Sequence, residues 1–514
     1  MRGASFRSSF GLWITLASTV ACHYPAQAAR SQTTKGQTTE AQAQRPNILF
    51  LFADDQRPDS VAAFGNEHIR TPVLDRLASR GYRFAQNYCM GGRHGAVCIC
   101  SRAMLMSGRS LPRVRDDMRD VHSLPQCLAE SGYVTFATGK WHNGPKAFLR
   151  CFQQGRNIML GGMSDHTKVP VVDLDPEKRT FSKVRTARRF SSRLFAETVI
   201  EFLDGRAAID KEAGERKPFF AYVAFTAPHD PRNPPEDYRK PYYEDLPPLP
   251  ANFRPQVEWF ADETWSHVRD ECLAAWPRDP DVIRQQLAEY YGLITHLDGQ
   301  IGRIFEALDK NGYGKNTVVV YTADHGLALG SHGLVGKQSI YEHSMGCPLI
   351  LAGPGIPAGK TSHALTYLLD LNPTLCKLAG AKVDASVEGR DLMPIVRGDS
   401  DKVRDSLFLM YRGTQRSVRD DRYKLIRFPE IDKTLLYDLQ DDPSELRDLS
   451  DLPQHEERVE KLWKLLESWQ AQVGDEAPLT VDQPRPQKRD LTGGKRKPDR
   501  WQPEWIRKKY FDDQ

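Results

Sequence analysis

Two cysteines stand one residue apart in GAVCICSRAMLMSGR, residues 95–109, and a thiol is one of the few side chains that can act as a nucleophile. A disulfide between Cys98 and Cys100 would close a strained ring, because only one residue separates them. A zinc site would need more Cys or His ligands at close spacing, and the sequence contains neither a C-x-x-C pair nor an H-x-x-x-H pair. The alternative without chemistry is that both thiols pack as small apolar side chains.

The residues after the cysteines favour the nucleophile. Ser101 to Ser107 has the pattern of a short helix, with Ser101 as its N-cap and Gly108 as its stop. Cys98 would then lie just ahead of a helix N-terminus. Backbone N–H groups and the helix dipole at that place attract anions and lower the pKa of a thiol. The position suits a nucleophile that acts on a charged ester.

Polar residues follow four apolar segments that we predict to be strands. They are Asp54 and Asp55 after NILFLFA, Lys140 and His142 after VTFAT, His229 after FFAYVAF, and Asp324 and His325 after TVVVYTA. Ligands of open α/β sheets bind outside the carboxyl ends of the strands, so these side chains are expected at one rim. Lys337 lies in the loop beyond. Taken singly, each would more often be a turn cap, a packed residue or a surface charge, but their coincidence indicates a site.

The elements that must position these residues alternate between strands and helices. The strand candidates are 47–55, 134–138, 219–225, 317–324 and 348–353. One helical pattern opens at Thr71-Pro72 and is closed by Gly81, and a long one covers 281–310. On the long helix, Tyr290, Tyr291 and His296 are expected to serve packing and hydrogen bonding. The pattern predicts an α/β fold with a mainly parallel sheet. Further short strands at 406–412, 422–428 and 434–439, with a helix over 455–472, predict a smaller C-terminal antiparallel sheet.

The linked motifs resemble the type I, formylglycine-dependent sulfatase family of the alkaline phosphatase superfamily over most of residues 46–450. The resemblance rests on NILFLFADD, C-x-x-S-R followed by AMLMSGR, TGKWH, APH, and ADHG with SHGLVGK, in the order of the family. It implies a large, mostly parallel mixed sheet flanked by helices, beside the smaller C-terminal sheet. It also implies that a formylglycine-generating enzyme oxidises Cys98 to formylglycine. Cys100 departs from the family, because Pro or Ala is usual at its position, and this bears on the efficiency of conversion.

The resemblance implies roles for the residues at the rim. Metal ligands would be Asp54, Asp55, Cys98, Asp324 and His325, and the carboxylates favour Ca²⁺, with Mg²⁺ or Mn²⁺ as alternatives. The catalytic set would be Cys98, Arg102, Lys140, His142, His229 and Lys337. Arg102 would orient the hydrated formylglycine, and both lysines would bind the sulfuryl oxygens. His229 would protonate the leaving alcohol and His142 would accept the second proton of the hydrate.

We expect Lys140, His229 and Lys337 to bind the substrate together with Arg93 and His94, which precede Cys98. The loops over residues 230–280 contain aromatic and basic residues, namely Trp259, Trp265, Trp276, Arg254, Arg269 and Arg278. Aromatic and basic loops suit a sulfated saccharide, and packing of an insertion is the alternative. We therefore expect a sulfatase acting on a sulfated carbohydrate. An aryl or choline sulfatase, a phosphonate monoester or phosphodiester hydrolase, and a sulfated-glycan binder are the other candidates.

The composition and the N-terminal residues indicate which partners are excluded and where the protein is expected to act. The chain has 514 residues and a net charge of +4, too small to imply nucleic acid as a partner. Residues 1–28 read as a signal peptide that ends in Ala26-Gln27-Ala28, with a lipoprotein box at Cys22 as the alternative, so a periplasmic or secreted protein is expected. No later apolar stretch approaches the ~20 residues of a membrane helix. The predicted order continues with a linker at 29–45, a catalytic domain at 46–380, a C-terminal subdomain at 381–480 and a basic tail at 481–514. A solvated tail is the default expectation, and a wrapping arm or a contact to an acidic polymer are the alternatives.

Overall fold

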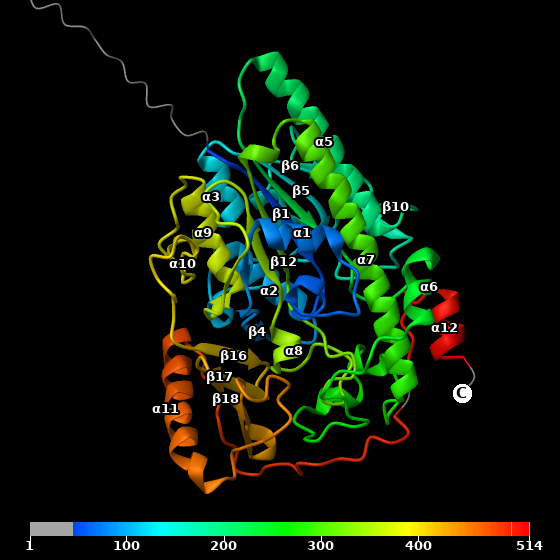
Figure 1. Cartoon of the computed structure of the whole chain (residues 1–514), viewed down its shortest axis with the longest axis vertical. Helices are drawn as coiled ribbons and strands as arrows, with labels where there is room; N and C mark the ends of the chain where they lie inside the picture. The colour runs from blue at the N-terminus through cyan, green and yellow to red at the C-terminus, as the bar shows by residue number, and fades with distance from the viewer. Residues whose placement is uncertain (1–44, 495, 513–514) are drawn as a thin grey trace, which may run out of the picture. The chain divides into compact units, whose positions relative to one another are not determined.

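The central sheet has eight strands in the order β14-β2-β13-β12-β1-β11-β5-β6 (Figure 1). The computed structural model describes residues 45–494 and 496–512, so the predicted signal peptide and all but the last residue of the predicted linker lie outside the described residues. In sheet order, the strands are β14 (Lys360–Ser362), β2 (Tyr82–Phe84), β13 (Leu349–Ala352), β12 (Thr317–Ala323), β1 (Asn47–Ala53), β11 (Phe219–Ala224), β5 (Val134–Lys140) and β6 (Gln154–Met159).

The middle of this sheet is parallel, and its strands are buried on both faces. Strands β12, β1, β11, β5 and β6 run in one direction, whereas β13 runs against β12. All seven residues of β1 are buried, and the same holds for β12. Continuous apolar runs of this kind are typical of parallel strands covered by helices on both sides. The carboxyl ends of β1 and β12 coincide, since Ala53 is the register partner of Ala323.

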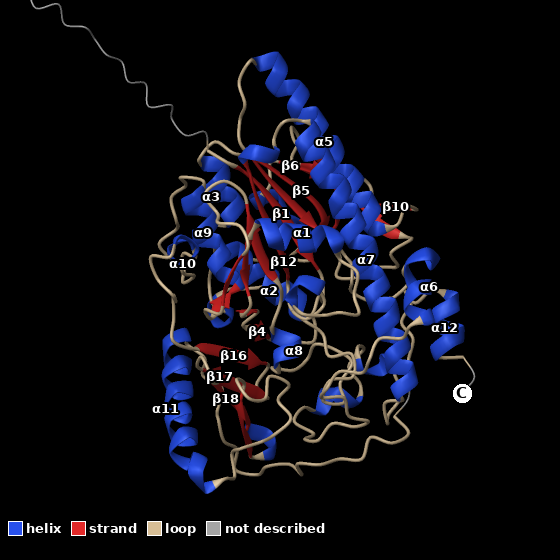
Figure 2. Cartoon of the chain, in the orientation of Figure 1, coloured by secondary structure: helices blue, strands red, loops and turns tan. Residues whose placement is uncertain are grey.

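Helices flank the sheet (Figure 2). The long pair α5 and α7 pack side by side, and α1 packs against α7, while α2, α3 and α9 contact one another. Asp279 caps α7 by accepting hydrogen bonds from the N–H groups of Asp281 and Val282. The bounds are α1 (Pro72–Arg80), α2 (Val97–Ser107), α3 (Leu124–Glu130), α4 (Pro145–Cys151), α5 (Ser191–Ala213), α6 (Glu236–Glu244), α7 (Pro280–Lys310), α8 (Glu342–Met345), α9 (Leu371–Leu378) and α10 (Met393–Arg397).

A second, five-stranded sheet follows in the order β19-β18-β17-β16-β4. The strands are β16 (Leu407–Tyr411), β17 (Gln415–Arg419), β18 (Tyr423–Phe428) and β19 (Lys433–Asp438), which pair antiparallel, and helix α11 (Glu456–Val473) packs against β17 and β18. The edge strand β4 (Gly91–Gly92) comes from the N-terminal half and pairs parallel with β16. The predicted fold class, a mixed sheet flanked by helices with a smaller antiparallel C-terminal sheet, is confirmed.

The remaining strands form two-stranded sheets at the edges of the core. They are β3 (Asn87–Tyr88) with β15 (Thr366–Tyr367), β7 (Val169–Val171) with β10 (Arg185–Ala187), and β8 (Leu174–Asp175) with β9 (Thr180–Phe181). Among the described residues, every helix is too short or too polar to span a bilayer.

The basic tail is not the solvated segment that we expected by default. Figure 1 shows it running along the lower edge of the molecule to helix α12 (Glu504–Tyr510), which lies beside α6 and α7. The Arg485 guanidinium lies 2.6 Å from Glu263, and the Lys509 ammonium lies 2.9 Å from Glu289 of α7. Tyr510 is buried. The default expectation was wrong and the alternative of a wrapping arm holds, because Arg485, Arg489 and Lys509 of the tail have acidic partners on the body.

Candidate active site

The ends of β1 and β12 bring two acidic pairs together. Asp54 and Asp55 follow β1, and Asp324 and His325 follow its parallel neighbour β12. The Asp55 N–H donates a 3.0 Å hydrogen bond to Asp324 Oδ1. Asp55 takes a φ of 64°, an uncommon conformation for a residue other than glycine. The neighbouring strand ends therefore give one buried group of three carboxylates and an imidazole.

Tyr290 of α7 holds the turn that carries Asp55. Its hydroxyl donates to the Asp55 carbonyl at 2.8 Å and accepts from the Arg57 N–H at 2.9 Å. From the sequence we expected this tyrosine to serve only packing and hydrogen bonding on the long helix. Its contribution depends on the way α7 packs beside β1, and a single sequence does not show that packing.

Cys98 lies in the first turn of α2 and faces this group. Its Sγ is 3.3 Å from His325 Nε2, 3.3 Å from Lys337 Nζ and 3.6 Å from Asp55 Oδ1. The predicted N-cap at Ser101 was five residues late, since the N-cap of α2 is Ala96 and the helix begins at Val97. The Ser101 hydroxyl does not cap the helix, because it donates to the Asp324 carbonyl at 2.6 Å.

Buried charges set the ionisation of this centre. Burial raises the pKa of the Cys98 thiol, but the positive charges of Lys140, Lys337 and His325 outweigh it and hold the pKa well below its ordinary value. Burial lowers the pKa of His325, but Asp324 and the other negative groups raise it to about 9. The site therefore favours an anion at the position of residue 98.

Arg102 of α2 joins three parts of the site. It is fully buried, and its guanidinium donates to Asp324 Oδ2 at 3.1 Å and to the Lys140 carbonyl at 2.8 Å. It also contacts the Tyr222 hydroxyl of β11 at 3.3 Å. Arg102 thereby ties helix α2 to the ends of β5 and β12.

Two buried lysines bring positive charge to the same place. Lys140, the last residue of β5, forms an ion pair with Asp54. Lys337 Nζ lies 2.8 Å from both carboxylate oxygens of Asp55. The loop that carries Lys337 is held because the Gln338 amide donates to the Gly95 carbonyl at 2.9 Å. Both ammonium groups converge on the group around Cys98.

Two histidines line the site. His229 Nε2 lies 3.7 Å from Asp55 Oδ2, and its Nδ1–H donates to the Asp230 carbonyl at 2.8 Å. His142 has a φ of 74°, its ring lies beside the Cys98 thiol, and its buried Nδ1 has no hydrogen-bond partner among the described residues. Burial lowers the pKa of His142 to about 4, so its imidazole is neutral near pH 7.

Arg93 and His94, predicted to bind substrate, contact Asp116. The Arg93 guanidinium lies 3.0 Å and the His94 ring nitrogen 2.8 Å from its carboxylate. Cys100, on the same turn of α2 as Cys98, also lies beside Asp116.

Some of the aromatic and basic residues of the loops over 230–280 are buried in the core and do not face a substrate. Trp265, Trp276 and Arg278 are buried, and the Arg278 guanidinium donates to backbone carbonyls that include Gly333 O at 2.9 Å. For these three residues the packing alternative holds. Trp259, Arg254 and Arg269 are partly exposed.

The donor set fits a divalent cation. Ligand atoms of Asp55, Cys98 and His325 lie within 4.8 Å of one another, and the same is true of Asp54, Cys98 and Asp324. Asp54 Oδ1 is buried with no hydrogen-bond partner among the described residues. Burial raises the pKa of this carboxyl well above its usual range, even beside Lys140. A bound cation would stabilise the charge that this residue otherwise buries at a cost.

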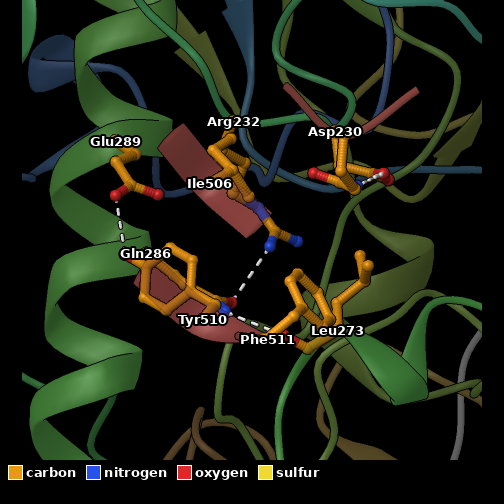
Figure 3. Close-up of a pocket in the computed structure, with 9 residues that line it drawn as sticks. Asp230, Arg232, Leu273, Gln286, Glu289, Ile506, Tyr510 and Phe511 are labelled. Atoms are coloured by element: carbon orange, nitrogen blue, oxygen red, sulfur yellow. Dashed lines mark hydrogen bonds between the residues drawn. The ribbon is translucent and has the colours of Figure 1, made fainter. Parts of the chain in front are cut away.

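The tail reaches this site through a chain of contacts that sequence patterns did not reveal. Asp230, next to His229, pairs with Arg269 at 2.9 Å and accepts from the Gln502 amide at 3.2 Å. Arg269 also lies 3.0 Å from Asp499. Figure 3 shows Asp230 at one side of a small pocket whose opposite side is formed by Tyr510 and Phe511 of the tail. The cavity measures about 20 Å³, the space of about one water molecule.

Comparison with known proteins places these features in a family. The sulfatase family model matches residues 46–381, and a model of the C-terminal region of N-sulphoglucosamine sulphohydrolase matches residues 330–472. The N-acetylglucosamine-6-O-sulfatase of Bacteroides thetaiotaomicron is 26% identical, over 85% of this chain and 88% of that protein. The ulvan-active sulfatase of Formosa agariphila is 27% identical, over 86% of this chain and 84% of that protein.

Solved structures include a protein with a similar fold. A protein in complex with its substrate, D-glucosamine-2-N,6-O-disulfate, superposes with a TM-score of 0.71 at 24% identity. The superposition covers 85% of this chain and 99% of the other. This similarity supports the fold.

Proposed function

Because the chain belongs to the sulfatase family of sulfuric ester hydrolases, we propose that it hydrolyses a sulfate ester on a sulfated carbohydrate, through a formylglycine formed from Cys98. The observation that carries this proposal is the position of Cys98, whose side chain meets His325, Lys337 and Asp55 within 3.6 Å at the carboxyl ends of two parallel strands. Formylglycine would supply, in its hydrated form, a hydroxyl nucleophile for attack on sulfur.

A Ca²⁺ ion is the cofactor that best suits the acidic group. Its ligands would be Asp54, Asp55, Asp324, His325 and the side chain derived from Cys98. Three carboxylates favour a hard cation, and the unpartnered Asp54 Oδ1 supports this assignment. Bound there, the ion would acidify the nucleophile and polarise a sulfuryl oxygen.

Lys140 and Lys337 would bind the sulfate group. Each ammonium is buried and pairs with a carboxylate that we assign to the cation. When those carboxylates ligate the ion, both ammonium groups become available for the sulfuryl oxygens. Arg102, held by Asp324 and the Lys140 carbonyl, would orient the side chain of residue 98.

The two histidines would divide the proton transfers. His229 donates its Nδ1–H to a carbonyl, which leaves Nε2 directed at Asp55 and free to carry the proton for the departing alcohol oxygen. His142 is neutral near pH 7 and contacts the Cys98 thiol, so it can accept the second proton of the hydrate. Its acceptance of that proton would release sulfate and restore the aldehyde.

The substrate class rests on the named relatives and on the rim of the site. The two curated relatives described above are named for activity on N-acetylglucosamine sulfate and on ulvan. Arg93 and His94 stand at the partly exposed rim, where they would contact the saccharide or a second anionic group on it. We also propose that the protein is exported, on the basis of the signal-like residues 1–28.

Two measurements on protein produced together with a formylglycine-generating enzyme test the proposal. The tryptic peptide that contains residue 98 should carry an aldehyde that hydrazide traps, and Cys98→Ala should eliminate turnover without loss of fold. A panel of defined sulfated saccharides should then identify the ester that is cleaved. Active protein with an unmodified thiol would exclude the formylglycine mechanism, and faster cleavage of a nitrophenyl phosphodiester than of nitrophenyl sulfate would exclude the sulfatase assignment.

A further inference from the structure

A second group of metal-type ligands, His94, Cys100 and Asp116, lies beside the candidate active site, and only His94 was given a role above, as a contact for the saccharide. Cys100 Sγ lies 3.5 Å from Asp116 Oδ1 and 3.9 Å from His94 Nε2, and His94 Nε2 lies 2.8 Å from Asp116 Oδ2. Two residues along an α-helix turn the side chain by roughly 200°. Cys98 and Cys100 therefore face different surroundings, although they share one helical turn.

The distances within this group suit a tetrahedral ion. With metal–sulfur bonds of about 2.3 Å and metal–nitrogen or metal–oxygen bonds of about 2.0–2.2 Å, tetrahedral ligand atoms lie roughly 3.3–3.6 Å apart. Of the three observed distances, the 3.5 Å from Cys100 Sγ to Asp116 Oδ1 lies within that range, the 2.8 Å from His94 Nε2 to Asp116 Oδ2 lies below it, and the 3.9 Å from Cys100 Sγ to His94 Nε2 lies above it. An ion that replaces the contact between His94 and Asp116 would need these side chains to separate by about half an ångström.

The backbone around the group is already held in place. The Asn143 amide donates to the Ile99 carbonyl at 2.9 Å and to the Asp116 carbonyl at 2.7 Å, which joins the first turn of α2 to the loop that carries Asp116. The Arg93 guanidinium binds Asp116 Oδ1 at 3.0 Å and the carbonyls of the same loop. Such hydrogen bonds to a ligating carboxylate are usual around metal sites, and Oδ2 remains for the ion.

Access from solvent completes the site. Cys100 is buried, whereas the His94 side chain is 44% exposed and the Asp116 side chain is 28% exposed. An ion can therefore enter from the His94 side and keep a water molecule as its fourth ligand. The site could not be predicted from the sequence spacing, because Asp116 lies 16 residues after Cys100 and only the path of the loop over residues 110–116 brings it back beside α2.

We propose that His94, Cys100 and Asp116 bind Zn²⁺, as a site distinct from the carboxylate group around Asp54. A thiolate, an imidazole and one carboxylate form a softer donor set than three carboxylates, and such a set selects Zn²⁺ over Ca²⁺. The site also gives a physical reason for a cysteine at position 100, where the family usually has Pro or Ala. Its occupancy would fix the first turn of α2, on which Cys98 stands.

Titration with Co²⁺ as the probe tests the site independently of sulfatase activity. Full-length Cys98→Ala protein removes the thiol of the other group, so a thiolate-to-cobalt absorption band must come from elsewhere. One Co²⁺ per chain should produce this band, and Zn²⁺ should displace it. On the same background, Cys100→Ala should abolish the band and His94→Ala should weaken Co²⁺ binding at least tenfold.

Cys127→Ala is the matched control, because the Cys127 thiol is also buried and lies 3.3 Å from a histidine, His122. This variant should keep the full band. The proposal is overturned if the natively folded background protein gives no thiolate band, or if the band persists in both the Cys100→Ala and His94→Ala variants. His94 is half-exposed, so its variant keeps the test decisive if the buried Cys100→Ala variant fails to fold.

Discussion

Positive and negative side chains alternate around Cys98, and all of them are buried. Lys337 pairs with Asp55, and Lys140 pairs with Asp54. Burying ions costs free energy even when they are paired, so such a group adds little to stability by itself. Its concentration at the ends of the central strands indicates a place where charges are kept for binding and reaction.

At this scale the carboxylates give the first prediction. Asp54→Ala and Asp324→Ala should each abolish turnover, because each removes a ligand from the proposed cation, and chelation should weaken the wild-type enzyme. Calorimetry should record the loss of Ca²⁺ binding in both variants. Asp117→Ala, which removes a half-exposed carboxylate that pairs with Arg119, should keep both properties. Full activity in either of the first two variants would remove that residue from the ligand set.

The lysines give the second prediction. Lys140→Ala and Lys337→Ala should each lower kcat by a factor of about 10²–10³, corresponding to ~3–4 kcal/mol, if they act like other donors to a developing oxyanion. Lys146→Ala, at an exposed position of α4, is the control for the loss of a lysine charge. Steady-state kinetics separates the outcomes, since a loss confined to KM would indicate uniform binding of substrate and transition state.

His142 gives a prediction about pH. Burial lowers its pKa to about 4 in the folded protein, so the neutral form that accepts a proton prevails above pH 4 and is lost as the pH falls through that value. Burial also lowers the pKa values of His166, His296, His332 and His343, so NMR of protein with labelled histidine rings should find several rings that stay neutral at pH 5. His142→Gln should remove one of these signals and leave the others. A His142 ring that titrates near pH 6.5 would contradict this assignment.

At the scale of elements, the strands that carry the site were predictable and their neighbours were not. Strands β1, β11 and β12 are continuous apolar runs with buried faces, and this pattern needs no tertiary information. Strand β17 reads QRSVR and was missed. It is buried only because Arg416 pairs with Asp475 and Arg419 pairs with Glu342, partners that are distant in the sequence.

The residues of the site likewise fall into those that could be predicted from the sequence and those that could not. Residues at strand ends could be placed from the sequence, because the geometry of parallel strands brings their carboxyl ends together. The tyrosine that holds the Asp55 turn, and the link from Asp230 to the tail, could not be placed. These contacts depend on helix packing and on the path of the last residues of the chain.

Gly139 supports an element-scale prediction, because it precedes Lys140 on β5. Its φ is +90°, and a Cβ there would lie 1.8 Å from the carbonyl oxygen of its β11 partner Ala224. Gly139→Ala should therefore part the end of β5 from β11, lower the melting temperature and reduce turnover. Gly144→Ala is the control, since Gly144 has a φ of +85° with no atom within 4 Å of its Cβ position. Equal melting temperatures for the two variants would show that the close contact is not limiting.

At the scale of the whole molecule, the C-terminal sheet and the tail support the segments that carry the site. The edge strand of the C-terminal sheet, Gly91–Gly92, lies four residues before α2, so the C-terminal sheet supports the segment that leads to Cys98. The tail passes from that sheet to α7 and contacts Asp230 on its way. The segment beside His229 is thereby held by residues more than 260 positions later.

The tail gives the last prediction. Gln502 and Asp499 contact Asp230 and Arg269, and the Asp230 carbonyl accepts the Nδ1–H of His229. If His229 protonates the departing oxygen, loosening this chain should slow the step that needs the proton. A Gln502→Ala, Asp499→Ala double variant should therefore lower kcat on a saccharide sulfate several-fold with little change in KM. On nitrophenyl sulfate, whose leaving group needs little protonation, the loss should be smaller.

The comparison of two leaving groups separates positioning from general destabilisation. A double variant that merely unfolds more readily would lose activity on both substrates in the same proportion. Glu504→Ala, an exposed change on the same segment that removes only the contact with Lys508, should leave both rates unchanged. Equal losses on the two substrates would mean that the tail supports the fold as a whole. A selective loss on the saccharide would mean that it acts through Asp230 on His229.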